Sequence, residues 1–205
     1  MGFFDVDDYM LKKMSIMGGM PQTLCEARGG YGGSWGLDGT IIFHGLPAAG
    51  RPASPPLHPS RTLRRVSEAG GTPEELTQAR HPQILPGGKA VLFNRKNAEG
   101  GWIMGVLSLE TGEEKIFPQP RVHPRYADTG HLIHLMDGKL WAAPFDLETL
   151  KVTGPFIPFP ERVWSWQYSI SENGTLAYVP DLGGSTLVWV DRNGNVKPTG
   201  VKAGN

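Results

Sequence analysis

The stretch at residues 37–43 reads LDGTIIF, a turn glycine followed by a short run of strand-forming residues. Glycine supplies the backbone conformation that tight turns need, and β-branched residues favour strands. The pattern returns three times, as PGGKAVLF (86–93), DTGHLIHL (128–135) and ENGTLAYV (172–179). These copies align four glycines, namely Gly39, Gly88, Gly130 and Gly174. The chain is therefore expected to repeat one turn-and-strand unit.

A second recurring pattern is an apolar strand that ends in Ser or Asp before a turn. Its copies are LKKMSIMGG (11–19), LRRVSEAGG (63–71), GVLSLETG (105–112), AAPFDLETL (142–150) and LVWVDRNG (187–194), which align Ser15, Ser67, Ser108, Asp146 and Asp191. A strand pair with one apolar face is not stable alone. Repetition of a four-stranded unit about every 40–45 residues predicts the antiparallel blades of an all-β β-propeller. Each blade should contain an inner strand before the glycine turn, a second strand after it, a third strand ending in Ser or Asp, and a short outer strand.

The strand count predicts one incomplete propeller domain over residues 1–205. Five third-type strands but only four inner strands are recognisable, so we expect about four blades plus part strands of a larger propeller. The segment 46–62 contains five prolines and no apolar periodicity, and it is interpreted as a surface loop inserted between a second and a third strand.

Composition narrows the classes of partner. Lys and Arg together number 20, as do Asp and Glu, so the formal net charge is zero and nucleic acid is not expected as a partner. The single cysteine provides neither a disulfide framework nor a zinc site. The N-terminus does not resemble a signal peptide, and no apolar run is long enough to span a membrane. The compartment is left open.

Several stretches carry a family resemblance that covers nearly the whole chain. SWGLDGTIIF, RRVSEAGGTPEELT, PQILPGGKAVLF, DGKLWAAPFDLETLKVTGP and YSISENGTLAY resemble TolB-type, WD-repeat-like propeller repeats, in particular those C-terminal to bacterial serine/threonine kinase domains. The resemblance implies a binding or scaffolding module, extracytoplasmic or periplasmic if it behaves like the kinase-associated relatives. The family's usual S-P-D-G turn is reduced here to its glycine. Kinase motifs are absent from the sequence, so these residues cannot supply kinase activity.

Motifs for catalysis and for metal binding are weak. GGSWG (32–36) matches the G-x-S-x-G pattern, but a nucleophile elbow needs a buried strand before its serine and a helix after it. Ser34 is instead expected to start an inner strand, so no catalytic residue is predicted. His131 and His134 are three apart on a predicted strand, which places them on opposite faces. No metal site and no cofactor are expected.

Basic residues recur ahead of the predicted inner strands. They are Arg28, Arg80, Arg121 and Arg162, joined by His81, His123 and Trp164. These connections should gather near the central opening, where guanidinium groups could hold an acidic peptide tail or a carboxylate ligand. The simpler and favoured interpretation is that each arginine pairs with a neighbouring blade or stays solvated.

The tryptophans divide into two groups. Trp35, Trp102, Trp141 and Trp189 fall in predicted strands and should pack between blades. Trp164 and Trp166 fall in a connection and are candidates for exposed contacts.

The leading functional hypothesis is a non-catalytic propeller that binds a protein or peptide as part of a larger sensor. The alternative is an accessory propeller of a kinase or peptidase whose catalytic domain lies outside this chain. A third hypothesis, that the chain is itself a hydrolase, depends on Ser34, and fluorophosphonate labelling would decide it.

Overall fold

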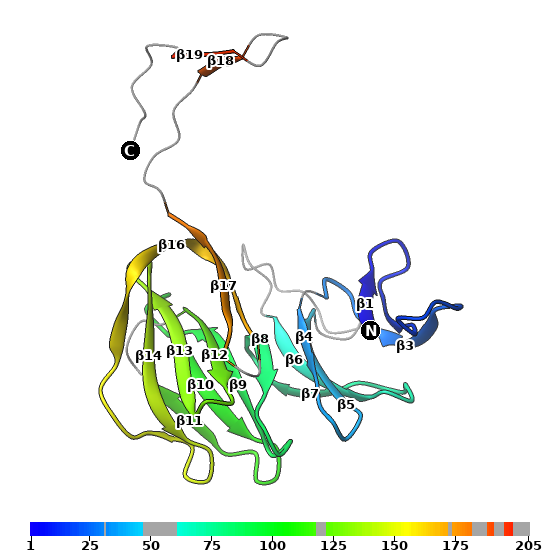
Figure 1. Cartoon of the computed structure of the whole chain (residues 1–205). Helices are drawn as coiled ribbons and strands as arrows, with labels where there is room; N and C mark the ends of the chain where they lie inside the picture. Colours follow the sequence, from blue (N-terminus) through cyan, green and yellow to red (C-terminus); the bar gives the residue numbers. More distant parts are fainter. Residues whose placement is uncertain are drawn as a thin grey trace.

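The computed structural model describes residues 1–30, 32–46, 61–117, 122–171, 174–181, 188–190 and 195–198. Every regular element in these ranges is a β-strand, and every pairing is antiparallel, as the repeats predicted (Figure 1). Most of the predicted insertion at 46–62 lies outside the described residues, as do Arg121 and Asp191.

The strands follow chain order across each sheet. The first sheet has three strands, β1 (Gly2–Asp5), β2 (Met10–Lys13) and β3 (Gln22–Glu26). The next is a four-stranded blade of β4 (Gly33–Trp35), β5 (Thr40–Gly45), β6 (Thr62–Ser67) and β7 (Glu74–Thr77). It is followed by a blade of β8 (Arg80–Ile84), β9 (Ala90–Lys96), β10 (Trp102–Ser108) and β11 (Glu114–Phe117).

The last large sheet joins one blade to the beginning of another. Its order is β12 (Val122–Ala127), β13 (His131–Met136), β14 (Lys139–Asp146), β16 (Ile157–Ile170) and β17 (Leu176–Pro180), with β15 (Lys151–Val152) paired to β14. The first part of β16 pairs with β14 as an outer strand, and its last part pairs with β17 as an inner strand. A separate hairpin contains β18 (Val188–Val190) and β19 (Val196–Pro198).

The aligned turn residues adopt the conformations that the repeats predicted. Gly39 and Gly130 have φ values of 81° and 82°, and Gly88 and Gly174 are also left-handed, a conformation that glycine adopts readily. At the end of β14, Asp146 Oδ1 accepts hydrogen bonds from the backbone N–H groups of Glu148 (2.8 Å) and Thr149 (2.9 Å). A short polar side chain therefore satisfies the turn that ends the third strand.

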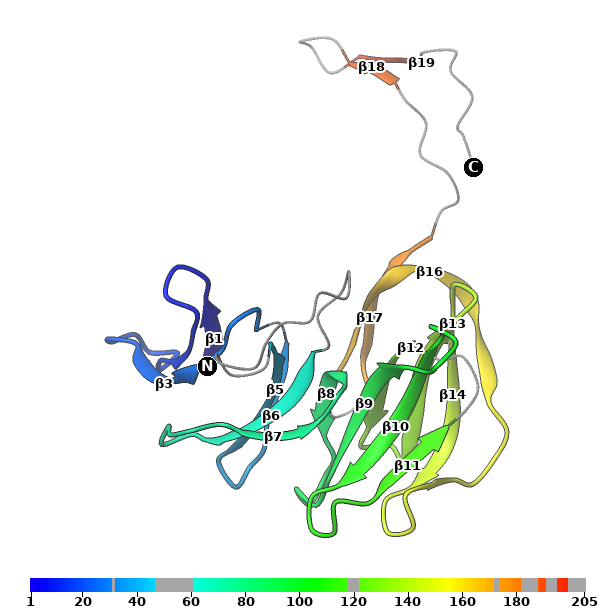
Figure 2. The same cartoon turned by 180° about the vertical axis from the view of Figure 1, so that it is seen from behind.

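The second strands β5, β9 and β13 are buried on both faces. In β5, Ile41 packs in the core shared with the first sheet, whereas Ile42 packs in the core shared with the blade of β8–β11. In β9, Val91 and Leu92 likewise face opposite cores. Such strands need continuous apolar runs, which explains IIF and VLF in the repeats. Figures 1 and 2 show these sheets standing side by side.

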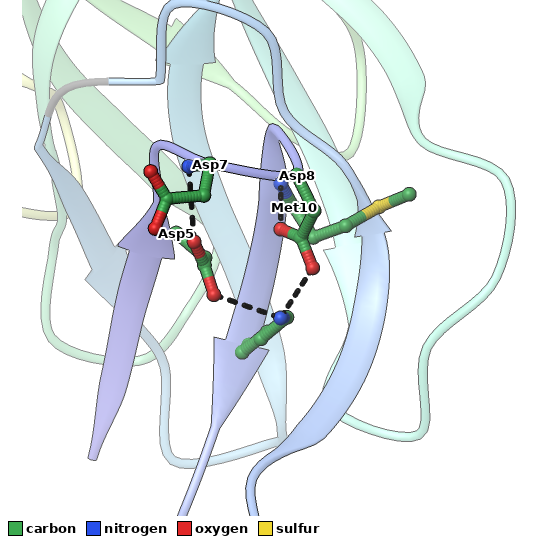
Figure 3. A network of polar contacts seen from close by, with 5 residues as sticks. Asp5, Asp7, Asp8 and Met10 are labelled. Atoms are coloured by element: carbon green, nitrogen blue, oxygen red, sulfur yellow. Dashed lines mark hydrogen bonds and ion pairs between the residues drawn. The ribbon is translucent and has the colours of Figure 1, made fainter.

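The hairpin between β1 and β2 is ordered by charge at the surface (Figure 3). Asp5 Oδ1 accepts a hydrogen bond from Asp7 N at 3.1 Å, and Asp8 Oδ1 accepts one from Met10 N at 3.1 Å. Lys12 Nζ lies 2.8 Å from Asp5 Oδ2 and also pairs with Asp8. The hydrogen bond from Lys12 lowers the pKa of Asp5 below its ordinary value. Because Asp8 is exposed and Asp5 is only partly buried, these carboxylates shape the turn more than they stabilise the fold.

Inner strands of neighbouring blades are joined by side chains. Gln83 Nε2 donates to Tyr126 O at 2.9 Å, and Tyr126 N donates to Gln83 Oε1 at 2.8 Å, which connects β8 to β12. Ser34 Oγ accepts from Ile84 N at 2.9 Å, which connects β4 to β8. These bonds fix the positions of the inner strands relative to one another.

Replacing Gln83 with alanine is therefore expected to destabilise the protein. The backbone groups of Tyr126 lose both partners at a partly buried site, so the free energy of unfolding should fall by about 2 kcal/mol. Urea denaturation of Gln83→Ala measures this loss. The exposed Gln22→Ala substitution in β3 is the matched control, and equal stabilities for the two variants would contradict the inter-blade role.

Candidate functional site

The inner strands begin with an unusual backbone conformation that recurs from blade to blade. His81, His123 and Ser165 have φ values of 54°, 51° and 52°. The strand register shifts at each of these places. A left-handed conformation costs a residue other than glycine about 1 kcal/mol or more. Its repetition at equivalent positions marks a feature of the architecture, and such bulges redirect side chains.

The residues at these bulges contribute to a row of aromatic rings that crosses several blades. Ring centroids lie 5.4 Å apart for His44 and His81, 4.2 Å for His81 and His123, and 5.2 Å for His123 and Trp166. The four rings come from β5, β8, β12 and β16 in that order. We call these four side chains the histidine row.

Hydrogen bonds from second strands hold the row in place. His44 Nδ1 accepts a bond from His81 N at 3.3 Å, and Asn94 Oδ1 accepts one from His123 N at 2.6 Å. The Tyr168 hydroxyl donates to the carbonyl oxygen of His123. Each left-handed histidine is thus bound through its backbone to the second strand of the preceding blade.

The histidines of the row are uncharged at neutral pH. Burial, with smaller contributions from the neighbouring His81, Arg61 and Arg80, lowers the pKa of His44 to about 3. Burial also lowers the pKa of His81 and of His123 to about 4, with nearby cationic side chains contributing. The row is therefore a neutral aromatic surface bordered by arginines.

A cavity of about 460 Å³ opens along the row. Its lining comprises the histidine row together with Arg61, Arg80, Asn94, Trp102 and Val122. Trp166 is 59% exposed, which is unusual for an indole that also stacks on a neighbouring ring. The site thus combines exposed aromatic surface with positive charge.

The structure brings together only part of the predicted arginine set. Arg80, His81 and His123 line the cavity. Arg28 pairs instead with Glu26 at 2.8 Å, and Arg162 pairs with Asp181 at 3.1 Å. These two arginines follow the simpler interpretation, in which each pairs locally. Arg121 lies outside the described residues.

The tryptophans also differ in part from expectation. Trp164 is 48% exposed but is not among the residues that line the cavity. Trp102 was expected to pack between blades, yet it lines the cavity beneath the Arg80 guanidinium, 5.3 Å from its ring centroid. The side chain of Trp189 is outside the described part. Sequence reasoning missed His44 and Arg61, although His44 and Asn94 both lie near the ends of second strands.

Ser34 lies in a blade strand and not in a nucleophile elbow. It lies in β4 and is followed by a turn and then by β5, so the strand-to-helix geometry of a nucleophile elbow is not formed. Within the described ranges, no group of three His, Cys, Asp or Glu side chains is placed to hold a metal ion. Those ranges also contain no helix that could cross a membrane.

Successive antiparallel sheets packed face to face define an incomplete β-propeller. The chain is similar to TolB from Acinetobacter baumannii, with 17% identity over 98% of this chain and 52% of that chain and a TM-score of 0.63. It is also similar to a putative TolB from Agrobacterium tumefaciens, with 14% identity over 96% of this chain and 78% of that chain and a TM-score of 0.60.

A third similar structure is a puromycin-hydrolyzing peptidase from Mycobacterium tuberculosis. Identity is 18% over 98% of this chain and 36% of that chain, with a TM-score of 0.59. The chain thus spans about half of the first TolB and about a third of the peptidase. No protein-family profile matches the chain, and no curated protein matches it. At these identities the likeness defines the fold alone.

The lowered pKa values of the histidine row predict a loss of stability in acid. Between the ordinary pKa of 6.5 and the folded value of about 4 for His123, the unfolded chain binds more protons than the folded one. Stability should therefore fall as the pH drops from about 7 towards 4, by about 2 kcal/mol for His123 alone. Urea denaturation of the parent and of His123→Gln at pH 7.5 and 4.5 measures this difference.

The variant should lose less stability than the parent over this range, because it lacks one titrating ring of the row. His131→Gln, outside the row, serves as the control and should retain the parent's pH dependence. The same acid loss in the parent and in His123→Gln would contradict the assignment.

Proposed function

We propose that the chain is a non-catalytic binding module that takes an extended peptide segment of a partner protein along the histidine row. The observation that carries this proposal is Trp166, an exposed indole stacked on His123 at the rim of the 460 Å³ cavity. Rigid, preorganised aromatic side chains of this kind dominate the energetics of many protein interfaces.

The geometry of the row favours a peptide. Successive ring spacings of 5.4, 4.2 and 5.2 Å set an upper limit on the length of the row, and this limit matches about four residues of extended chain. Aromatic faces accept apolar side chains, and neutral imidazoles carry both donor and acceptor nitrogens that suit a peptide backbone. Because the backbone bonds of His81 and His123 hold the rings in place, binding requires little ordering of the site.

The runner-up is an accessory propeller of a larger enzyme. The likeness to a puromycin-hydrolyzing peptidase, of which this chain matches 36%, supports a peptidase. The alternative that the larger enzyme is a kinase is supported by the sequence resemblance alone. The coding sequence adjacent to this chain distinguishes the runner-up from a stand-alone binding module, because a fused kinase or peptidase domain would be encoded there.

Peptide selection tests the proposal. The 205-residue chain is immobilised, peptides are selected from a displayed random heptapeptide library, and the affinities of synthetic copies are measured by fluorescence anisotropy. Trp166→Ala should weaken binding by about tenfold or more, since hot-spot aromatics contribute this much.

Trp35→Ala is the matched control, because Trp35 is a 37% exposed indole in β4 that does not line the cavity. Failure to select any peptide, or equal binding by the parent and Trp166→Ala, would refute the histidine row as the binding surface.

A further inference from the structure

A second cavity of about 520 Å³ adjoins the histidine row and shares three lining residues with it, Arg61, Arg80 and Trp102. Arg95, Lys96 and Asn97 also line it. Four cationic side chains therefore converge on one hollow, beside the place where a peptide would lie. We call this hollow the basic pocket.

The positive charge of the basic pocket is only partly compensated. Arg95 pairs with Glu114 at 2.6 Å. In the part of the chain that the structure describes, Arg61, Arg80 and Lys96 have no carboxylate partner. Residues 46–61, which precede β6 in the sequence, contain neither Asp nor Glu.

The cations are held in place by other contacts. The Arg80 guanidinium lies 5.3 Å and Lys96 Nζ 5.6 Å from the centroid of the Trp102 ring. Arg61 donates to the carbonyl oxygen of Gly29. A cation–π contact orients a cation without neutralising it. The basic pocket is thus preorganised and retains excess positive charge.

Mutual repulsion among these groups adds to the argument. Burial lowers the pKa of Arg80, and the nearby charge of Arg61 lowers it further. An anion placed between them would relieve this repulsion. Guanidinium groups bind carboxylates through two parallel hydrogen bonds, which makes a carboxylate a well-matched occupant.

We propose that the basic pocket is a carboxylate subsite, and that the peptide taken by the histidine row is acidic next to its apolar anchor. This inference rests on the proposed function. The carboxylate belongs either to an Asp or Glu side chain or to the free C-terminus of the peptide, and both sources present the same chemistry to Arg61, Arg80 and Lys96.

Three synthetic peptides test the proposal. The first is an acetylated, amidated pentapeptide with one phenylalanine and two aspartates. The second replaces the aspartates with asparagines, and the third is the asparagine peptide with a free C-terminal carboxylate. Calorimetry should show the aspartate peptide binding the parent about tenfold more tightly than the amidated asparagine peptide, an advantage that shrinks with added salt.

Charge-removing substitutions locate the subsite. Lys96→Gln, which lines only the basic pocket, should reduce the advantage of the aspartate peptide while leaving the asparagine peptide's affinity unchanged. Arg80→Gln should reduce the same advantage, measured as the ratio of the two affinities, because Arg80 lines both cavities. Arg65→Gln is the matched control, because Arg65 pairs with Glu74 in β6 and β7 away from the pocket. Thermal melting checks that each variant is folded, and Lys96→Gln carries the test if Arg80→Gln is not.

Each outcome decides something. Tight binding of the third peptide shows that the basic pocket accepts the free C-terminal carboxylate of a peptide, and this result supports the proposal. Equal binding of all three peptides, or an unchanged aspartate advantage in Lys96→Gln, overturns the carboxylate subsite and leaves the proposed function standing. Failure of all three peptides to bind overturns the carboxylate subsite, whereas the proposed function is tested separately by the selection from the heptapeptide library.

Discussion

Burial of the second strands β5, β9 and β13 on both faces is the constraint on which the rest of this structure depends. A strand such as β9, with Val91 in one core and Leu92 in another, is stable only between two neighbouring sheets. The sheets must therefore stack in sequence, and each interface between them becomes a hydrophobic core. Glycine turns and polar strand ends follow from the need to reverse the chain within every blade.

The candidate site is built from the same contacts between blades. Asn94, at the end of β9, binds the backbone of His123, and His44, at the end of β5, binds the backbone of His81. Each left-handed residue is held where the second strand of one blade meets the inner strand of the next. The strain in the backbone is thus offset by inter-blade bonds, and the side chains that it redirects form a continuous surface.

The sequence predicted the blades well because their determinants are local and repeated. Gly39 and Gly130 are recognisable since a left-handed turn position favours glycine over other residues. The entry positions of Arg80, His81 and His123 were predicted for the same reason. The ion-pair partners of Arg28 and Arg162, which are Glu26 and Asp181, were not predicted, because a repeat pattern does not encode such contacts.

The sequence also did not predict which residues far apart in the chain would meet at the site. His44 and Trp166 are more than 100 positions apart, and only the stacking of blades brings their rings into one row. The sequence predicted that Trp102 packs between blades, whereas in the structure the Arg80 guanidinium lies over its ring. Long-range neighbourhoods of this kind depend on the rotation between blades, which periodicity alone does not specify.

Hydrogen exchange tests the central claim, that burial between neighbouring sheets stabilises each blade. Backbone amides of β9, in a blade packed on both faces, should exchange most slowly. Amides of β1 and β17 should exchange faster, because each of their sheets packs against one neighbour within the described ranges. Protection of β1 or β17 equal to that of β9 would contradict the account.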